Sequence, residues 1–211
     1  MPEIVLAGPA GRIETKYHKS YRTDAPVAII LHPHPLHGGT MNNKVTYSTY
    51  QAFVQKGFNV MRFNFRGVGR SEGTFDNGEG ELADAAAVLD WLQSDNPNAS
   101  GFWVAGFSFG AWIAMQLLMR RPEINGFISV SPPANIYDFN FLAPCPVSGL
   151  MIQGTSDEIV SLEAVESLAK KLSAQKAVTV SFEKIEGADH FYTGKLNSLI
   201  DTIGTYLETH T

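Results

Sequence analysis

Five residues, Gly106-Phe107-Ser108-Phe109-Gly110, place a serine between two flanking glycines. An apolar, strand-prone run precedes them at 102–105, and an apolar helical run follows at 111–119. A Gly-x-Ser-x-Gly pattern between a strand and a helix is typical of a nucleophile elbow, a sharp turn that exposes the serine hydroxyl. Glycine suits both flanks because a Cβ there would clash with the crowded backbone. We therefore predict that Ser108 is a nucleophile.

A serine hydroxyl is a poor nucleophile until a neighbouring base takes its proton, and that base needs an acid to orient it. Asp157 follows one apolar strand-like run, and His190 follows the next one. We predict that His190 is the base of Ser108 and that Asp157 orients it. Glu158 and Asp189 are rival acids, and Asp157 is favoured by its place just after the glycine that ends the strand.

Strand-like and helix-like runs alternate along the chain. Strands are expected at 3–7, 11–18, 27–31, 58–65, 102–105, 127–131, 146–153 and 178–182. Helices are expected from a cap at Asn42 or Asn43 to about residue 56, at 79–93, at 111–119, after a cap at Ser161, and from 196. This alternation predicts an α/β fold, a single domain over residues 1–211 with a mainly parallel central sheet flanked by helices. In such sheets, functional groups gather at the carboxyl ends of the strands. The loop 32–40, Ser108, Asp157 and His190 all follow predicted strands.

Together these features resemble the α/β-hydrolase superfamily over almost the whole chain. The elbow, the glycine-rich loop 66–71, Gly154-x-x-Asp157 and Asp189-His190-Phe191 stand where that superfamily places them. The loop His32-Pro33-His34-Pro35, with Gly38-Gly39-Thr40, is similar to a small bacterial branch of predicted serine hydrolases with little or no lid. The resemblance implies a catalytic triad of Ser108, Asp157 and His190. The segment 132–146 is too short for a cap domain, so we expect an open active site.

An acyl-transfer site must also stabilise the negative oxygen of the tetrahedral intermediate. We expect the backbone N–H of Phe109 to be one donor, with the second N–H coming from the loop after strand 27–31. The prolines of that loop carry no N–H. His34 is the preferred second donor, with Leu36 and Gly38 as alternatives.

Several apolar side chains are candidates to line an acyl groove near Ser108: Leu36, Phe75, Phe107, Phe109, Ile136, Phe139 and Phe141. No cofactor is expected. The loop from Gly67 lacks the third glycine of a dinucleotide-binding turn and is not followed directly by a helix. No metal is expected either, because the loop that holds His32, His34 and His37 contains no carboxylate or cysteine. A structural hydrogen-bonding role is favoured for His32.

The composition indicates a globular protein: 211 residues, 44% hydrophobic and 18% charged. The net charge of −5 and the absence of a basic cluster argue against a nucleic-acid partner. A lone Cys145 allows no internal disulfide, and the sequence shows neither a signal peptide nor the ~18 apolar residues of a membrane span. We predict a cytoplasmic protein with no membrane span. Exposed aromatic residues would suit a homodimer, for which the sequence locates no interface.

We predict a serine hydrolase that cleaves a small-molecule carboxylic ester or thioester through an acyl-enzyme. Two alternatives stay open: a peptidase or amidase with the same triad, and a non-catalytic binding protein with the α/β-hydrolase fold. A dehalogenase is disfavoured because that chemistry needs a carboxylate at the position of Ser108.

Overall fold

The computed structural model describes residues 3–211, in which eight strands form one sheet in the order β1-β2-β4-β3-β5-β6-β7-β8. Only the β1–β2 and β2–β4 pairs in this sheet are antiparallel, and the other five pairs are parallel. The strands are β1 (Glu3–Gly8), β2 (Gly11–His18), β3 (Val27–Leu31), β4 (Asn59–Phe63), β5 (Phe102–Phe107), β6 (Ile124–Val130), β7 (Gly149–Gly154) and β8 (Val180–Ile185). The predicted mainly parallel sheet is confirmed.

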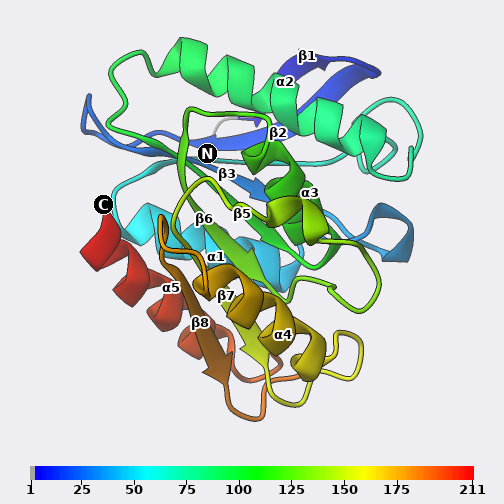
Figure 1. Ribbon diagram of the computed structural model, residues 1–211. Coiled ribbons are helices and arrows are strands. Elements are labelled where there is room, and N and C mark those ends of the chain that lie inside the picture. Colours follow the sequence, from blue (N-terminus) through cyan, green and yellow to red (C-terminus); the bar gives the residue numbers. More distant parts are fainter. Residues whose placement is uncertain (1–2) are drawn as a thin grey trace.

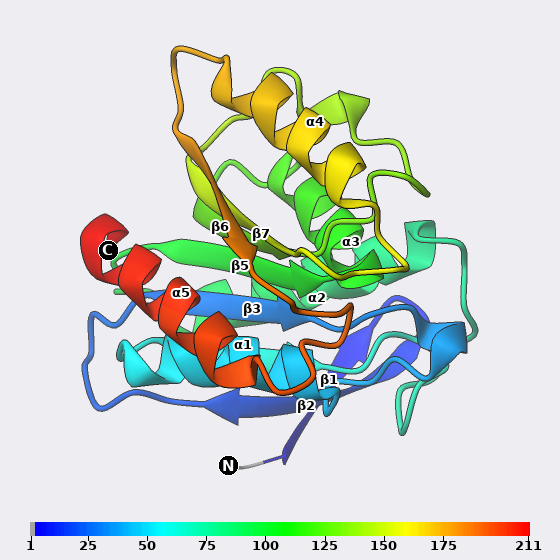
Figure 2. The same cartoon turned by 90° about the horizontal axis from the view of Figure 1, so that it is seen from below.

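Helices cover both faces of the sheet (Figures 1 and 2). One face carries α1 (Lys44–Gln55) and α5 (Leu196–His210), and the other carries α2 (Glu79–Asp95), α3 (Phe109–Leu118) and α4 (Leu162–Ser173). Alternate side chains of a strand point to opposite faces. Thus Ile29 and Leu31 of β3 pack in the core under α2 to α4, whereas Ala28 and Ile30 pack in the core under α1 and α5. A strand buried on both faces needs the continuous apolar run seen at 27–31.

Two helices begin at the predicted caps. The side chain of Asn43 accepts hydrogen bonds from the backbone N–H groups of Val45 and Thr46, and the Ser161 hydroxyl accepts from Ala164. Such side chains satisfy the amides that a helix leaves without a partner in its first turn. Helix α1 therefore begins at Lys44, four residues after the loop 32–40 ends.

Strand ends differ from the prediction by a few residues. Strand β4 is shorter than 58–65, and β7 begins three residues after Pro146. Strand β8 begins at Val180 rather than 178 and continues to Ile185, because its pairing with β7 runs to the end of both strands. The segment between β6 and β7 contains one 3-10 turn, Asn140–Leu142, and no α-helix. The fold is therefore a single α/β sheet structure without a substantial cap.

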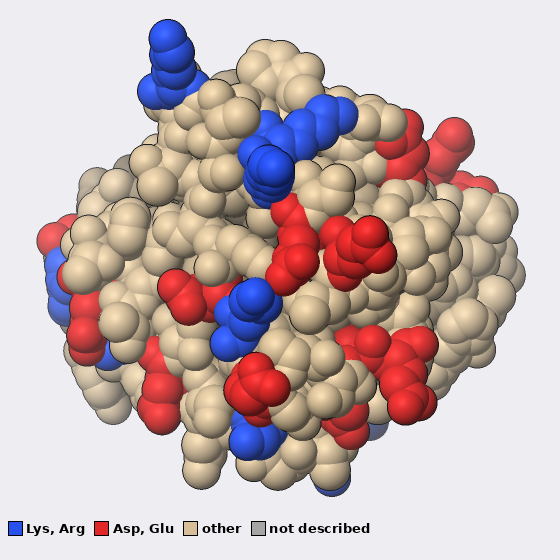
Figure 3. Space-filling model, turned by 60° about the horizontal axis from the view of Figure 1, so that its bottom comes forward, with Lys and Arg blue, Asp and Glu red and all other residues tan. Residues whose placement is uncertain are grey.

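The described helices include none that is long and apolar enough to cross a membrane. On the face in view in Figure 3, acidic and basic side chains are interspersed with uncharged surface. Two ion pairs show the same mixing, Arg12 with Glu72 and Lys184 with Glu166. Exposed pairs of this kind contribute little to stability. The organisation that matters for chemistry lies at the carboxyl edge of the parallel strands.

Candidate active site

Ser108 lies at the sharp turn between β5 and α3, with φ 54° and ψ −121°. A Cβ added to Gly106 would come within 3.0 Å of the Gly110 carbonyl oxygen, and one added to Gly110 would come equally close to the His32 carbonyl oxygen. These contacts are the physical reason for both glycines. The backbone N–H of Ser108 donates to the Val130 carbonyl oxygen at 2.9 Å, which ties the turn to β6. The positive φ of a non-glycine residue marks a strained position, as expected of a nucleophile elbow.

His190 and Asp157 meet in the loops after β8 and β7. Nδ1 of His190 lies 2.8 Å from Oδ2 of Asp157, and both side chains are almost fully buried. The ring of His190 packs against Phe107, with ring centroids 4.9 Å apart. With Nδ1 held by the carboxylate, Nε2 is the ring nitrogen that remains for a reacting proton.

Asp157 accepts four hydrogen bonds. Its Oδ1 accepts from the backbone N–H groups of Ile159 and Val160, and its Oδ2 accepts from His190 and from Nε2 of Gln153. Burial raises the pKa of the Asp157 carboxyl, but the hydrogen bonds from His190, Val160 and Ile159 outweigh it and hold the pKa below its usual value. The carboxylate form is therefore the one that this site stabilises.

The rival acids lie differently. Asp189 accepts a hydrogen bond from the backbone N–H of Thr193 at 2.8 Å, so its carboxylate holds the turn after His190. Glu158 is exposed. Of the three acids, Asp157 is the one that contacts the ring of His190.

Ser108 and His190 line one cleft with a volume of about 270 Å³, which we call the main cleft. Its walls are Pro33, His34, His37, Gly38, Gly39, Asn43, Phe109, Pro133, Ile136, Tyr137, Ile159 and Phe191. Of the predicted groove residues, Phe109 and Ile136 lie in these walls. The structure thus brings the serine and the histidine of the predicted set into a common, largely apolar space.

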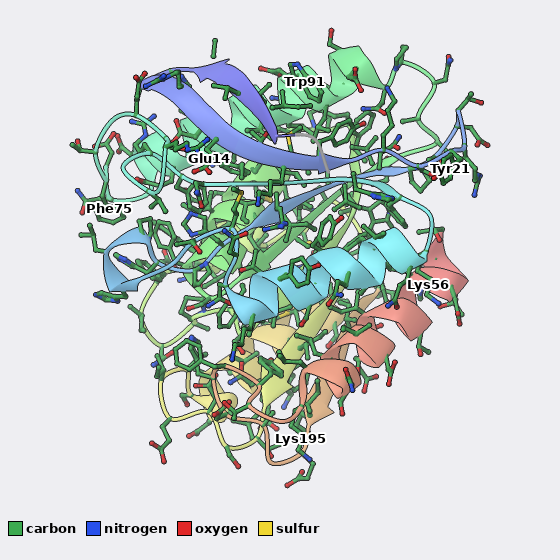
Figure 4. All side chains as sticks on the ribbon, turned by 180° about the vertical axis from the view of Figure 1, so that it is seen from behind. Glu14, Tyr21, Lys56, Phe75, Trp91 and Lys195 are labelled. Atoms are coloured by element: carbon green, nitrogen blue, oxygen red, sulfur yellow. The ribbon has the colours of Figure 1, made fainter. Side chains whose placement is uncertain are left out.

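The other predicted groove residues do not line the main cleft. Leu36 points into solvent, Phe107 is buried behind His190, and Phe139 stacks with Phe141 instead. Phe75 supports the wall from outside, with its ring 4.9 Å from His34 (Figure 4). The main cleft is lined instead by Tyr137, Ile159 and Phe191. No local sequence pattern identifies these wall residues, because the fold brings them together.

The loop after β3 is more regular than its prolines predicted. Pro35–His37 forms one 3-10 turn, because Nδ1 of His34 accepts the Leu36 N–H at 3.2 Å and the His34 carbonyl accepts the His37 N–H at 3.1 Å. The Leu36 amide is thereby occupied. Within the described chain, the backbone N–H of His34 has no protein partner, and Phe109 opens α3, where a helix leaves its amides without partners.

His32 is a structural residue of this loop. Its Nδ1 lies 2.6 Å from the Pro33 carbonyl oxygen, and its Nε2 accepts the Phe65 N–H at 3.0 Å. Complete burial lowers the pKa of His32 to about 4, so the ring stays neutral, with Nδ1 as donor. Both ring nitrogens are engaged, which agrees with the predicted hydrogen-bonding role.

Comparison with known proteins places the chain in a family. A model of the X-Pro dipeptidyl-peptidase (S15) family matches residues 21–177. The chain belongs to the S15 family. An uncharacterized protein of Rickettsia prowazekii is 54% identical over 99% of this chain and 90% of its own length. The lysophosphatidylserine lipase ABHD12 of Bos taurus is 27% identical over 76% of this chain, which spans only 44% of that lipase.

Solved structures show similarity to α/β-hydrolases. A protein of unknown function from Agrobacterium tumefaciens, assigned to the α/β-hydrolases, is 53% identical and has a TM-score of 0.95, covering 98% of this chain and 95% of its own. A lidless α/β serine hydrolase of Xanthomonas campestris is 33% identical and has a TM-score of 0.89, covering 99% and 94%. The S15 member described here is therefore a lidless α/β serine hydrolase.

Three further residues near the site of this hydrolase were not predicted from the sequence: Gln153, Ser131 and Tyr192. Gln153 donates a hydrogen bond to Asp157. A polar residue in the otherwise apolar run of β7 is the sequence feature that could have identified it. Ser131 and Tyr192 form a buried hydroxyl pair at 3.0 Å, and both have positive φ. This pair links the end of β6 to the turn after His190. Only the fold brings the two hydroxyls together.

Proposed function

We propose that the protein hydrolyses carboxylic esters or thioesters through an acyl-enzyme formed on Ser108. The observation that supports this most strongly is the position of His190, which binds Asp157 through Nδ1 and shares the main cleft with Ser108. The single Cys145 is buried, which suits a reducing compartment, so we place the reaction in the cytoplasm.

In this proposal, Oγ of Ser108 attacks the acyl carbonyl carbon while Nε2 of His190 takes its proton. Asp157 holds the ring and stabilises its charged form. The negative carbonyl oxygen accepts hydrogen bonds from the N–H groups of Phe109 and His34. His190 then returns the proton to the leaving oxygen or sulfur, and water cleaves the acyl-enzyme by the same steps in reverse.

The charge of the main cleft favours an ester over the peptide suggested by the family's name. An enzyme that removes dipeptides must bind the free ammonium of its substrate, and a carboxylate is the usual partner of such a cation. The described walls of the main cleft contain no aspartate or glutamate, and their apolar part suits an uncharged acyl chain. The lipase ABHD12 is a distant relative whose name likewise denotes ester hydrolysis.

A fluorophosphonate tests the nucleophile directly. We expect wild-type protein to gain the mass of one adduct within minutes, and Ser108→Ala to gain none. Ser156→Ala, in the turn just before Asp157, is the matched control and should label like wild type. A folded wild-type protein that stays unlabelled would instead support the non-catalytic binding protein.

A matched pair of substrates, 4-nitrophenyl butanoate and butanoyl 4-nitroanilide, distinguishes ester cleavage from amide cleavage. We expect the ester to be cleaved with the higher kcat/KM, because the amine is the poorer leaving group and the main cleft holds no partner for a peptide's charged end. Faster cleavage of the anilide, or of an X-Pro anilide with a free amino group, would favour the peptidase.

A further inference from the structure

A second hollow of about 540 Å³ opens beside the main cleft, and we call it the side cleft. One wall comes from the residues that lead into α1, and the other from the residues that follow His190. The residues used below are Thr40, Asn42, Asn43, Lys44, Phe191 and Thr193. Asn43 and Phe191 line both hollows, so the two are adjacent. The side cleft is lined by residues at the start of α1 and of α5, two helices that pack side by side (Figure 2).

The leaving group must lie next to His190, because Nε2 of that ring gives it the proton. The chain from His190 runs through Phe191 to Thr193 and forms one wall of the side cleft. The apolar wall of the main cleft with Pro133 and Ile136 comes from the segment after β6 and suits an acyl chain. A leaving group beside His190 would therefore face the side cleft.

Hydrogen-bond donors dominate the wall before α1. Lys44 is exposed, and its ammonium forms no ion pair within the described chain. Oδ1 of Asn42 accepts from Nη1 of Arg62 at 2.6 Å, and Oδ1 of Asn43 accepts from the first amides of α1. With both oxygens occupied, the NH2 groups of the two asparagines are left to donate.

A buried cation lies behind this wall. Arg62 is only 3% exposed, and its Nη1 donates to the Met41 carbonyl oxygen as well as to Asn42. Its guanidinium carbon lies 5.0 Å from the centre of the Tyr47 ring, and no carboxylate of residues 3–211 forms an ion pair with it. Asp189, the residue before His190, does not line the side cleft, and its Oδ1 accepts the Thr193 N–H.

Resting on the ester or thioester hydrolysis proposed above, we propose that the side cleft selects leaving groups that carry an anionic group such as phosphate. Lys44 lines the side cleft and Arg62 lies behind Asn42, whereas none of the described lining residues is an aspartate or a glutamate. In the acylation step, the bond from the acyl carbon to the ester oxygen or thioester sulfur breaks. The proton of Ser108 passes through His190 to that atom, and the anionic alcohol or thiol departs.

Two glycerol esters that differ only in a phosphate test the proposal: 1-butanoylglycerol and 1-butanoylglycerol 3-phosphate. We expect wild type to prefer the phosphate ester by about fivefold or more in kcat/KM, the effect of a favourable exposed ion pair. Lys44→Glu should abolish or invert the preference. Lys170→Glu, the same charge change at an exposed position of α4, should keep it. Raising the ionic strength should weaken the preference, because salt screens exposed charges.

The outcomes separate the two proposals. Equal kcat/KM for the two glycerol esters, or cleavage of 4-nitrophenyl butanoate alone, overturns the anionic leaving group and leaves the ester hydrolase standing. A preference that Lys44→Glu does not change also overturns the role of the side cleft. Absence of all hydrolysis and of the fluorophosphonate adduct overturns the hydrolase proposal itself.

Discussion

At the scale of single residues, Asp157 is defined by the groups that surround it rather than by its place in the sequence. Four donors converge on one carboxylate, two from the backbone and two from the side chains of Gln153 and His190. The backbone donors fix the carboxylate, and the carboxylate fixes the ring. The orientation of His190 is thus built into the turn that follows β7.

Replacement of Asp157 by asparagine tests this arrangement. The amide cannot stabilise a charged His190 ring, so we expect kcat to fall by about 10²–10⁴-fold. Because native hydrogen bonds hold the pKa of Asp157 below its unfolded value, its ionisation stabilises the fold at neutral pH, and that contribution is lost as the pH falls through the lower folded pKa. The melting temperature of wild type should therefore drop more steeply in acid than that of Asp157→Asn.

Thermal unfolding followed by circular dichroism from pH 7 to about pH 3 measures the difference, over the window below the ordinary carboxyl pKa. Glu158→Gln removes a charge one residue away without these hydrogen bonds and is the control. Parallel curves for wild type and Asp157→Asn would show that the hydrogen bonds around this carboxylate do not favour its charged form.

The hydroxyl pair of Ser131 and Tyr192 makes a second prediction at this scale. Removing one hydroxyl leaves the other buried without a partner, which costs about 1–3 kcal/mol. We expect Ser131→Ala and Tyr192→Phe each to lower the free energy of unfolding by this amount, and the double variant to lose less than the sum. Urea unfolding of the four proteins measures the coupling. Strictly additive losses would mean that the hydroxyls do not act as a pair.

At the scale of elements, the β5–α3 turn depends on the absence of two side chains. A Cβ on Gly106 would meet backbone atoms of Gly110, which cannot move without opening the turn. We expect Gly106→Ala to lose fluorophosphonate labelling and about 1–3 kcal/mol or more of stability. Gly204→Ala, inside α5, is the contrasting control.

A Cβ on Gly204 would meet only the flexible end of the Lys56 side chain, and alanine favours a helix over glycine by about 1 kcal/mol. Gly204→Ala should therefore keep its labelling, with an unchanged or higher melting temperature. If Gly106→Ala is labelled at the wild-type rate, the crowding at the turn does not control the serine.

Elements were largely predictable because local patterns determine them. The apolar run 27–31, the cap at Asn43 and the alternation of strands and helices depend on neighbouring residues. The pair of Ser131 with Tyr192 and the wall residues Tyr137 and Ile159 could not be predicted, because contacts between segments far apart in the chain create them. The prediction that Leu36 lines the groove was wrong for a related reason. The apolar type of a residue does not indicate which side of a loop its side chain faces.

At the scale of the whole molecule, the main cleft is open because nothing in the described chain is placed to close over it. The segment from Ser131 to Ser148 contains only a 3-10 turn, and its residues Pro133, Ile136 and Tyr137 form a wall of the main cleft. A hydrolase with a mobile cap gains activity when an aggregated substrate draws the cap away. In the proposed ester hydrolysis, an acyl chain would meet an apolar surface that is already exposed.

We therefore expect no jump in rate when an ester substrate passes its critical micelle concentration. With 4-nitrophenyl esters of increasing chain length, the rate should follow the monomer concentration and level off once micelles form, because the open cleft takes monomers. Each added CH2 group that is buried should strengthen binding by roughly 0.8 kcal/mol, a fall in KM of about fourfold, until the 270 Å³ of the main cleft is filled. A sharp rise in rate above the micelle concentration would show that some part of the molecule covers the site in solution and moves at an interface.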